Sequence, residues 1–215
     1  VLSRLVYGIR ATVFLSLLTM AITSALGACV GLVSGFFRNR IDDVLMRICD
    51  VMMSFPSEVM ILAIVGMTGP GLENVVIANV VAKWPWYARM VRSIVRQYSD
   101  KDYIRFAKVA GGSSIRIMMR HLLPGTAGEL FVLTTLDTGS VILMISALSF
   151  LGLGVQPPTP EWGMMLNEAK EVMTLYPLQM IPAGMAILLV VAAFNFLGDS
   201  LRDAFDPKHA GRERS

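Results

Sequence analysis

The sequence predicts an all-α polytopic membrane protein. Of its 215 residues, 54% are hydrophobic and only 16% are charged, and the mean hydropathy is +0.61. These values are typical of membrane proteins rather than of water-soluble domains. A helix that crosses the hydrocarbon needs about 20 mainly apolar residues, and the chain contains several runs of that length with one charge or none.

Five spans are predicted from these runs. They cover about residues 11–37, 51–69, 74–91, 129–151 and 178–198. The first and last contain no charged residue, and the second contains only Glu58. Asp137 is the only charge between residues 130 and 160, whereas the third run is interrupted by Lys83 and Pro85.

The distribution of Lys and Arg predicts the orientation, because cations near span ends stay on the cytoplasmic side. If the first span runs inward, 15 of the 19 cations lie inside, and only Arg4, Arg10 and Lys170 lie outside, with Lys83 within the membrane. The C-terminus is then cytoplasmic and residue 1 is outside. One further span is therefore expected upstream of Val1, which makes six in the native protein.

The first span contains Gly27, Gly31 and Gly35, spaced four residues apart. On a helix this spacing forms a flat strip that lets a second helix approach closely. The plain alternative is that glycine is simply frequent in membrane helices. The pattern does not say whether the neighbouring helix belongs to this chain or to another.

Two longer connections are predicted, a cytoplasmic loop over about 95–124 and an outer loop over about 152–177 that carries a short helix at about 162–174. In the cytoplasmic loop, Ser99 followed by Asp102 resembles a capping box, which predicts a helix start near Asp100. Gly111 and Gly112 are expected to stop this helix.

A second helix in the same loop is predicted to begin at Ser113 or Ser114, either of which can cap it, and to end at Pro124. The loop is therefore expected to be a helix, a tight bend and a helix. Pattern alone leaves two functions open: an amphipathic hairpin bound to the membrane surface, or a docking element for another protein.

This loop resembles that of the permease subunits of binding-protein-dependent ABC importers, whose pattern is E-A-A-x(3)-G-x(9)-I-x-L-P. The matching positions are Arg105, Phe106, Ala107, Gly111, His121, Leu123 and Pro124. The glycine and the proline are thirteen positions apart, as in the family. Arg105, Phe106 and His121 depart from the pattern. The resemblance implies that these residues, with Gly112, couple the chain to a separate ATPase.

Other segments narrow the resemblance, which extends over essentially the whole chain. "LSFLGLGVQPPTPEWGMMLNEA" (148–169) and "GDSLRDAFDP" (198–207) are similar to signatures of the C-type subunit of dipeptide, oligopeptide and nickel permeases. "WPWYARMVRS" (84–93) and "TLDTGS" (135–140) resemble the nickel or metal-chelate branch more than the peptide branch. The implied architecture is the type I ABC importer permease fold, a single transmembrane permease domain over residues 1–215.

The resemblance implies a multi-pass subunit of the bacterial cytoplasmic (inner) membrane that forms half of a path for nickel, another metal chelate or a peptide. Its implied partners are a second, B-type permease subunit, two ATP-binding subunits, an extracytoplasmic substrate-binding protein and the lipid bilayer. Whether the permeases pair as a heterodimer or a homodimer stays open. No nucleic acid is expected.

The chain is predicted to be a transporter subunit and not an enzyme, because it has no G-x-x-x-x-G-K-[ST] phosphate-binding loop. ATP and Mg are expected on the partner ATPases, and no cofactor on this chain. Two rivals remain: a secondary carrier driven by an ion gradient, which would need an acid or His relay, and a membrane enzyme, for which no nucleophile with a base is visible.

Ionisable groups at membrane depth cost about 2.5–3.5 kcal/mol on insertion scales, so they need partners or a function. The candidates for the translocation path are Asp137, Glu58, Trp84 and Trp86. For Asp137 the alternative is an interhelix hydrogen bond to Lys83 or Ser140, and for the tryptophans it is packing or interface anchoring. No metal site is predicted, since the fifteen methionines are better explained as flexible packing.

Overall fold

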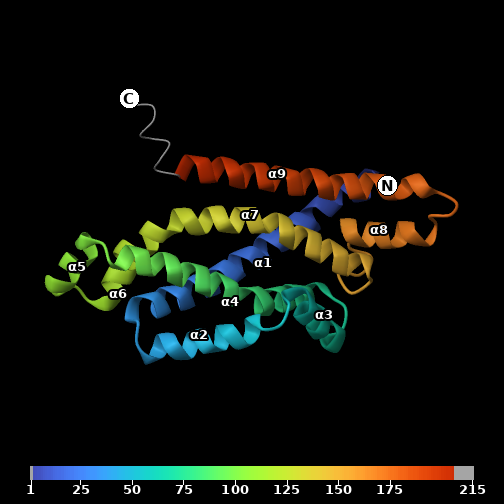
Figure 1. Ribbon diagram of the computed structural model, residues 1–215. Coiled ribbons are helices and arrows are strands. Elements are labelled where there is room, and N and C mark those ends of the chain that lie inside the picture. The colour runs from blue at the N-terminus through green and yellow to red at the C-terminus, as the bar shows by residue number, and fades with distance from the viewer. Residues whose placement is uncertain (1, 206–215) are drawn as a thin grey trace.

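The computed structural model describes residues 2–205, which fold into helices joined by turns (Figure 1). The helices are α1 (Leu2–Phe37), α2 (Arg40–Met53), α3 (Ser57–Thr68), α4 (Leu72–Ser99), α5 (Asp102–Val109), α6 (Ser114–Ile117), α7 (Leu123–Phe150), α8 (Trp162–Glu171) and α9 (Ile181–Phe205), with a π-helical turn at Met118–Leu122 and a 3-10 turn at Pro177–Met180. No strand occurs within this range. The all-α prediction is confirmed.

Three helical stretches are long and apolar enough to cross a membrane: Leu2–Phe37, Ser114–Phe150 and Pro177–Phe205. They contain the predicted spans 11–37 and 178–198, and all but the last residue of 129–151. α4 contains the predicted span 74–91 as one unbroken helix, with Pro85 inside it, but it does not reach the same apolar threshold. By this criterion residues 2–205 hold three spans, or four if α2 and α3 count as one; the count of five is not confirmed.

The predicted span over about 51–69 is not formed by one continuous helix. α2 ends at Met53 and α3 begins at Ser57, and the two helices are bent by 80° relative to each other. Proline has no N–H to donate and disfavours helical geometry in the residue before it, so Pro56 breaks the run after Phe55. The Ser54 hydroxyl donates to the Val51 carbonyl at 2.6 Å and closes the end of α2.

α1 and α4 lie against each other along the strip of three glycines. A Cβ on Gly31 would lie 2.6 Å from the Ala88 carbonyl oxygen, and one on Gly35 would lie 2.8 Å from Val95. A Cβ on Gly27 would clash with Tyr87. The helix that packs on the glycine strip therefore belongs to the same chain, and the two backbones approach as closely as small-residue interfaces allow.

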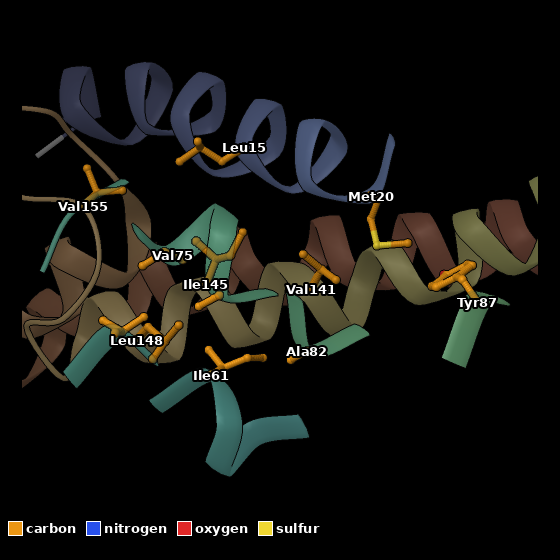
Figure 2. Close-up of a cluster of buried hydrophobic side chains, with 12 residues drawn as sticks. Leu15, Met20, Ile61, Val75, Ala82, Tyr87, Val141, Ile145, Leu148 and Val155 are labelled. Atoms are coloured by element: carbon orange, nitrogen blue, oxygen red, sulfur yellow. The ribbon is translucent and has the colours of Figure 1, made fainter. Parts of the chain in front are cut away.

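The main apolar core lies between α1, α3, α4 and α7 (Figure 2). The labelled side chains are Leu15 and Met20 from α1, Ile61 from α3, Val75, Ala82 and Tyr87 from α4, Val141, Ile145 and Leu148 from α7, and Val155 from the segment after α7. α9 runs along the outside of α7 (Figure 1), where Gly198 faces Leu136.

Pro124 does not end a helix, contrary to prediction. α6 continues through the π-helical turn into α7, and Pro124 lies in the first turn of α7. Because the helix runs on from the π turn, Pro124 is internal to it and lacks the N–H that an ordinary helix residue would donate to the preceding turn. The wider π turn directly before it accommodates the missing hydrogen bond.

Candidate functional site

An open cavity of about 470 Å³ lies between the α2–α3 bend, α4 and α7. Its polar wall consists of Ser57, Glu58, Lys83, Asp137 and Ser140. Lys83 and Asp137 both lie near the middle of 28-residue helices, so the cavity is at half the height of the bundle. A volume of this size is in the range of small-ligand sites.

Lys83 and Asp137 form an ion pair in the wall of the cavity. The Lys83 Nζ donates to Asp137 Oδ1 at 2.9 Å and to Oδ2 at 3.0 Å, and the Tyr87 hydroxyl donates to Oδ2 at 3.2 Å. The side chains of Lys83 and Asp137 are 16% and 21% exposed. Charges this poorly solvated need partners, and each partner here can also reach a ligand in the cavity.

Of the residues predicted for a translocation path, Glu58, Trp86 and Asp137 line this cavity together. Trp84 does not; it packs beside Met46 and Cys49 of α2. Of the two hydrogen-bond partners predicted for Asp137, Lys83 and Ser140, the structure places Lys83 on its carboxylate, together with Tyr87.

Sequence reasoning did not place Tyr87 in the wall. Its four-residue spacing from Lys83, which puts both on one face of α4, was the available signal.

The loop over residues 100–122, here called the α5–α6 loop, is a helix, a bend and a helix, but its first cap differs from prediction. α5 begins at Asp102 after the N-cap Lys101, which makes no side-chain cap hydrogen bond. Ser99 is the buried last residue of α4, so the predicted capping box is wrong. The chain had not yet left α4 where the local pattern suggested a new start.

The bend of the α5–α6 loop depends on two glycines with different roles. Gly111 has φ +77°, which glycine adopts without strain, and open space surrounds it. A Cβ on Gly112 would lie 2.8 Å from the Ala107 carbonyl oxygen. Ser113 caps α6, because its hydroxyl accepts from the Arg116 N–H at 3.4 Å. The two helices are therefore held in one compact turn.

The α5–α6 loop has a buried apolar face and an exposed face on which apolar side chains stand among basic ones. Ile104, Ile117 and Leu122 are buried with Leu32, Val91 and Val95 of the helical bundle, and Ala107 and Leu123 pack on this cluster. The opposite side exposes Tyr103, Phe106, Val109, Ile115 and Met119, which we call the apolar tip. Phe106 is 77% exposed and Val109 is 87% exposed, so water covers large apolar side chains unless another protein does.

The remaining predicted coupling residues differ in exposure. Arg105, Gly111 and Pro124 are exposed. His121 is half-buried, with its ring 6.4 Å from that of Tyr103.

An ionic cluster that sequence reasoning missed joins α1, α2 and α4 next to this loop. Asp42, whose side chain is 4% exposed, accepts from Arg92 at 2.5 and 2.7 Å and also from Arg96 and Ser34. The four-residue spacing of the two arginines on α4 was the available signal. The two guanidinium groups share one carboxylate, which connects the three helices to one another.

The adjacent turn is held by Arg38, at the end of α1. Its guanidinium lies 3.0 Å from Asp100 Oδ1 and also donates to the Arg96 carbonyl at 2.8 Å. The hydrogen bond from Arg38 holds the pKa of the Asp100 carboxyl below its ordinary value. Arg38 therefore connects the end of α1 to the start of the α5–α6 loop.

The opposite end of the bundle is closed by the segment that leads into α8. Glu161 is fully buried; it accepts from the Thr12 hydroxyl at 3.1 Å, from the Ser146 hydroxyl at 3.4 Å and from the Met164 N–H at 2.9 Å. Trp162 donates from its indole to the Leu5 carbonyl at 2.9 Å. The motif at 148–169 thus ties α8 to α1 and α7, a role that the sequence did not reveal.

Within residues 2–205 no group of three or more His, Cys, Asp or Glu side chains is arranged to hold a metal ion. The polar side chains of the cavity are arranged to bind a charged or polar ligand from two helices at once.

Comparison with known proteins gives a consistent result. Residues 27–210 match the family described as "Binding-protein-dependent transport system inner membrane component". The chain is 41% identical over 214 residues to the metal-staphylopine import system permease protein CntC of Staphylococcus aureus (strain Mu50 / ATCC 700699), with 100% of this chain and 74% of that protein covered. It is 42% identical over 207 residues to the di/tripeptide transport system permease protein DppC of Pseudomonas aeruginosa (strain UCBPP-PA14), with 96% and 68% covered.

The fold resembles a chain in a structure titled "Inward facing conformations of the MetNI methionine ABC transporter". The TM-score is 0.76 at 16% sequence identity, and the alignment covers 94% of this chain and 97% of that one. At this identity the likeness concerns the fold alone.

Proposed function

The chain belongs to the family of binding-protein-dependent transport system inner membrane components and is a permease subunit of an ABC importer; we propose that its substrate is a metal chelate. The observation that carries this proposal is the resemblance of the segments at 84–93 and 135–140 to the metal-chelate branch. The 41% identity to a metal-staphylopine permease over the full length of the chain is consistent with it. The first segment contains Trp86 and Tyr87 of α4, and the second contains Asp137 and Ser140 of α7. All four residues line the cavity.

A di- or tripeptide is the second candidate. It is favoured by the 42% identity to a di/tripeptide permease, which is no lower than the identity to the metal-chelate relative. Both substrate classes would pass between α4 and α7, with Asp137, Glu58 and Trp86 in the path wall.

The α5–α6 loop is the proposed coupling element. The chain has no phosphate-binding loop of its own, and ATP with Mg is bound and hydrolysed by partner subunits. The apolar tip supplies what a docking element needs: large side chains, exposed and held on a rigid turn. Two ATP-binding subunits would close on ATP and move the loops of two permeases, because ATP binds one state of the assembly better than the other.

This assignment orients the chain in the bacterial inner membrane. The end with the α5–α6 loop, and with it the end of α9 at Phe205, lies in the cytoplasm, and the end with α8 lies outside, where a substrate-binding protein would dock. The C-terminus, predicted to be cytoplasmic, lies outside the described residues. A second, B-type permease would complete the path. The excess of Lys and Arg at the loop end supports this orientation.

Proteoliposomes that contain the assembled importer test the proposal. Uptake of a radiolabelled nickel–histidine chelate, and of a labelled dipeptide, is measured with and without ATP and with and without the binding protein. The proposal expects chelate uptake that requires both ATP and the binding protein. Uptake of the dipeptide alone would replace the metal substrate with the second candidate, and uptake driven by an ion gradient without ATP would contradict the coupling proposal.

A further inference from the structure

The central cavity is lined by the carboxylates of Glu58 and Asp137 and by the ammonium group of Lys83. Lys83 and Asp137 already pair with each other. Resting on the proposed function, we infer that the cavity binds substrates that carry a positive centre and a carboxylate together, and that such a substrate exchanges with the Lys83–Asp137 ion pair. The substrate carboxylate pairs with Lys83, and the positive centre of the substrate pairs with Asp137. The positive centre is an ammonium group in a peptide and the metal ion in an amino-carboxylate chelate.

The geometry leaves both charges accessible to a ligand. Lys83 directs its ammonium at both oxygens of Asp137, at 2.9 and 3.0 Å, and both side chains line the cavity. The Asp42 cluster provides a contrast within the same molecule, because Asp42 is 4% exposed and is surrounded by Arg92, Arg96 and Ser34. The Asp42 cluster is closed to ligands, whereas the Lys83–Asp137 pair faces open space.

Charge pairing determines the substrate class. A ligand with only a positive charge would take Asp137 and leave Lys83 without its partner at membrane depth, which is costly. A ligand with only a carboxylate would pair with Lys83 and leave Asp137 without its partner. A ligand with both charges keeps every group paired. Glu58 adds a second carboxylate to the wall, so the cavity favours a neutral or net positive substrate over an anion.

The rest of the wall fits a small organic substrate better than a bare ion. The cavity measures about 470 Å³, far more than one hydrated metal ion needs, and comparable to sites for small organic ligands. Trp86 presents a large apolar surface beside the charges. It packs edge-to-face on Tyr87, with the two ring centroids 5.0 Å apart. Tyr87 in turn holds Asp137 in place through its hydroxyl.

Protection from chemical labelling tests the inference directly. In the assembled importer, Ser140→Cys places a thiol on the cavity wall, with Cys29→Ser removing the other exposed thiol of this chain. Maleimide labelling of the peptide that contains residue 140 is followed by mass spectrometry. The probes are alanyl-alanine, its N-acetyl form, its C-terminal amide and the nickel–histidine chelate.

The inference expects that alanyl-alanine, the chelate or both slow the labelling. The two blocked dipeptides are expected to need about tenfold or more higher concentration for the same protection, because each has lost a charged hydrogen bond. Protection by only one of the two intact probes identifies the source of the positive centre. Equal protection by a blocked form, or no protection by any probe, would overturn the inference. ATP-driven uptake by the same vesicles would leave the proposed function standing in that event.

A neutral double variant separates a ligand-binding pair from a merely structural one. Lys83→Met with Asp137→Asn removes both charges together, so no charge is left unpaired and the assembly is expected to form. The matched control is Arg89→Met with Asp50→Asn, which removes an exposed pair between α4 and α2. We expect the first variant to lose protection and uptake by about tenfold or more, and the control to keep both. Wild-type protection in the first variant would overturn the inference.

Discussion

Gly31 of α1 lies so close to Ala88 of α4 that a Cβ on the glycine would be 2.6 Å from the Ala88 carbonyl oxygen. The clash would be with backbone, which cannot rotate away as a side chain does. α1 and α4 therefore form a rigid pair, and α4 also carries Lys83 of the cavity and runs to the α5–α6 loop. The position of the cavity wall relative to the loop depends on this contact.

Gly31→Ala is expected to destabilise the assembled protein by about 1–3 kcal/mol, the usual cost of overpacking a tight interface. Thermal unfolding of the purified complex in detergent measures the change. The control is Gly184→Ala, because no atom lies within 4 Å of a Cβ at that position of α9. Equal stability of the two variants would show that the helices separate more readily than the structure implies.

Asp42→Asn is expected to lower the free energy of unfolding by roughly 2–3 kcal/mol, because it leaves Arg92 and Arg96 without their shared carboxylate. Asp50→Asn serves as the control: it breaks a pair on the same two helices, α2 and α4, but Asp50 is 59% exposed, so the cost should be below about 1 kcal/mol. Urea or thermal unfolding followed by circular dichroism compares them. A larger effect at Asp50 would contradict the structural role assigned to Asp42.

Glu161→Ala is expected to loosen the end of the bundle near α8, since it leaves the buried Thr12 and Ser146 hydroxyls and the Met164 N–H without an acceptor. Amide hydrogen exchange over residues 152–171 should become faster, while exchange in α4 stays unchanged. Glu171→Ala, at the exposed end of α8, should leave both rates unaltered. Unchanged exchange in Glu161→Ala would mean that Trp162 alone holds this segment.

Gly111→Trp is expected to depress both substrate uptake and transport-coupled ATP hydrolysis, because it adds bulk to the turn beside the apolar tip. Gly111→Asn separates bulk from backbone strain, since asparagine tolerates positive φ better than other side chains do. We expect normal insertion for both variants and substantially better activity for the asparagine. Normal uptake by the tryptophan variant at wild-type expression would count against docking at this turn.

Composition and charge predicted the apolar spans in α1, α7 and α9, because a bilayer imposes a length and a polarity that a window of sequence reveals. The break between α2 and α3 was missed because hydropathy averages over Ser54 and Pro56, which decide backbone geometry. Pro124 was wrongly predicted to end a helix because its backbone effect was considered without the residues around it. Proline does remove a backbone hydrogen bond, but the π turn before Pro124 lets the helix continue.

The candidate site was predicted in part. Asp137, Glu58 and Trp86 were chosen because charged and aromatic side chains in apolar runs are costly or unusual, and the structure groups them around one cavity. Trp84 was grouped with Trp86 by adjacency, yet residues two apart on a helix face different directions. The Asp42 cluster and the anchoring of Glu161 depend on contacts between segments distant in sequence, which a single sequence does not display.

The central claim is that the α5–α6 loop docks on a separate ATPase, and crosslinking tests it most directly. A photoreactive residue in place of Val109, at the apolar tip, is activated in the intact importer in membranes, with the same residue in place of Phe196 on the exposed face of α9 as the control. The account predicts a covalent adduct between position 109 and an ATP-binding subunit, and none from position 196. Adducts at position 109 that contain only lipid, or only other membrane subunits, would contradict it.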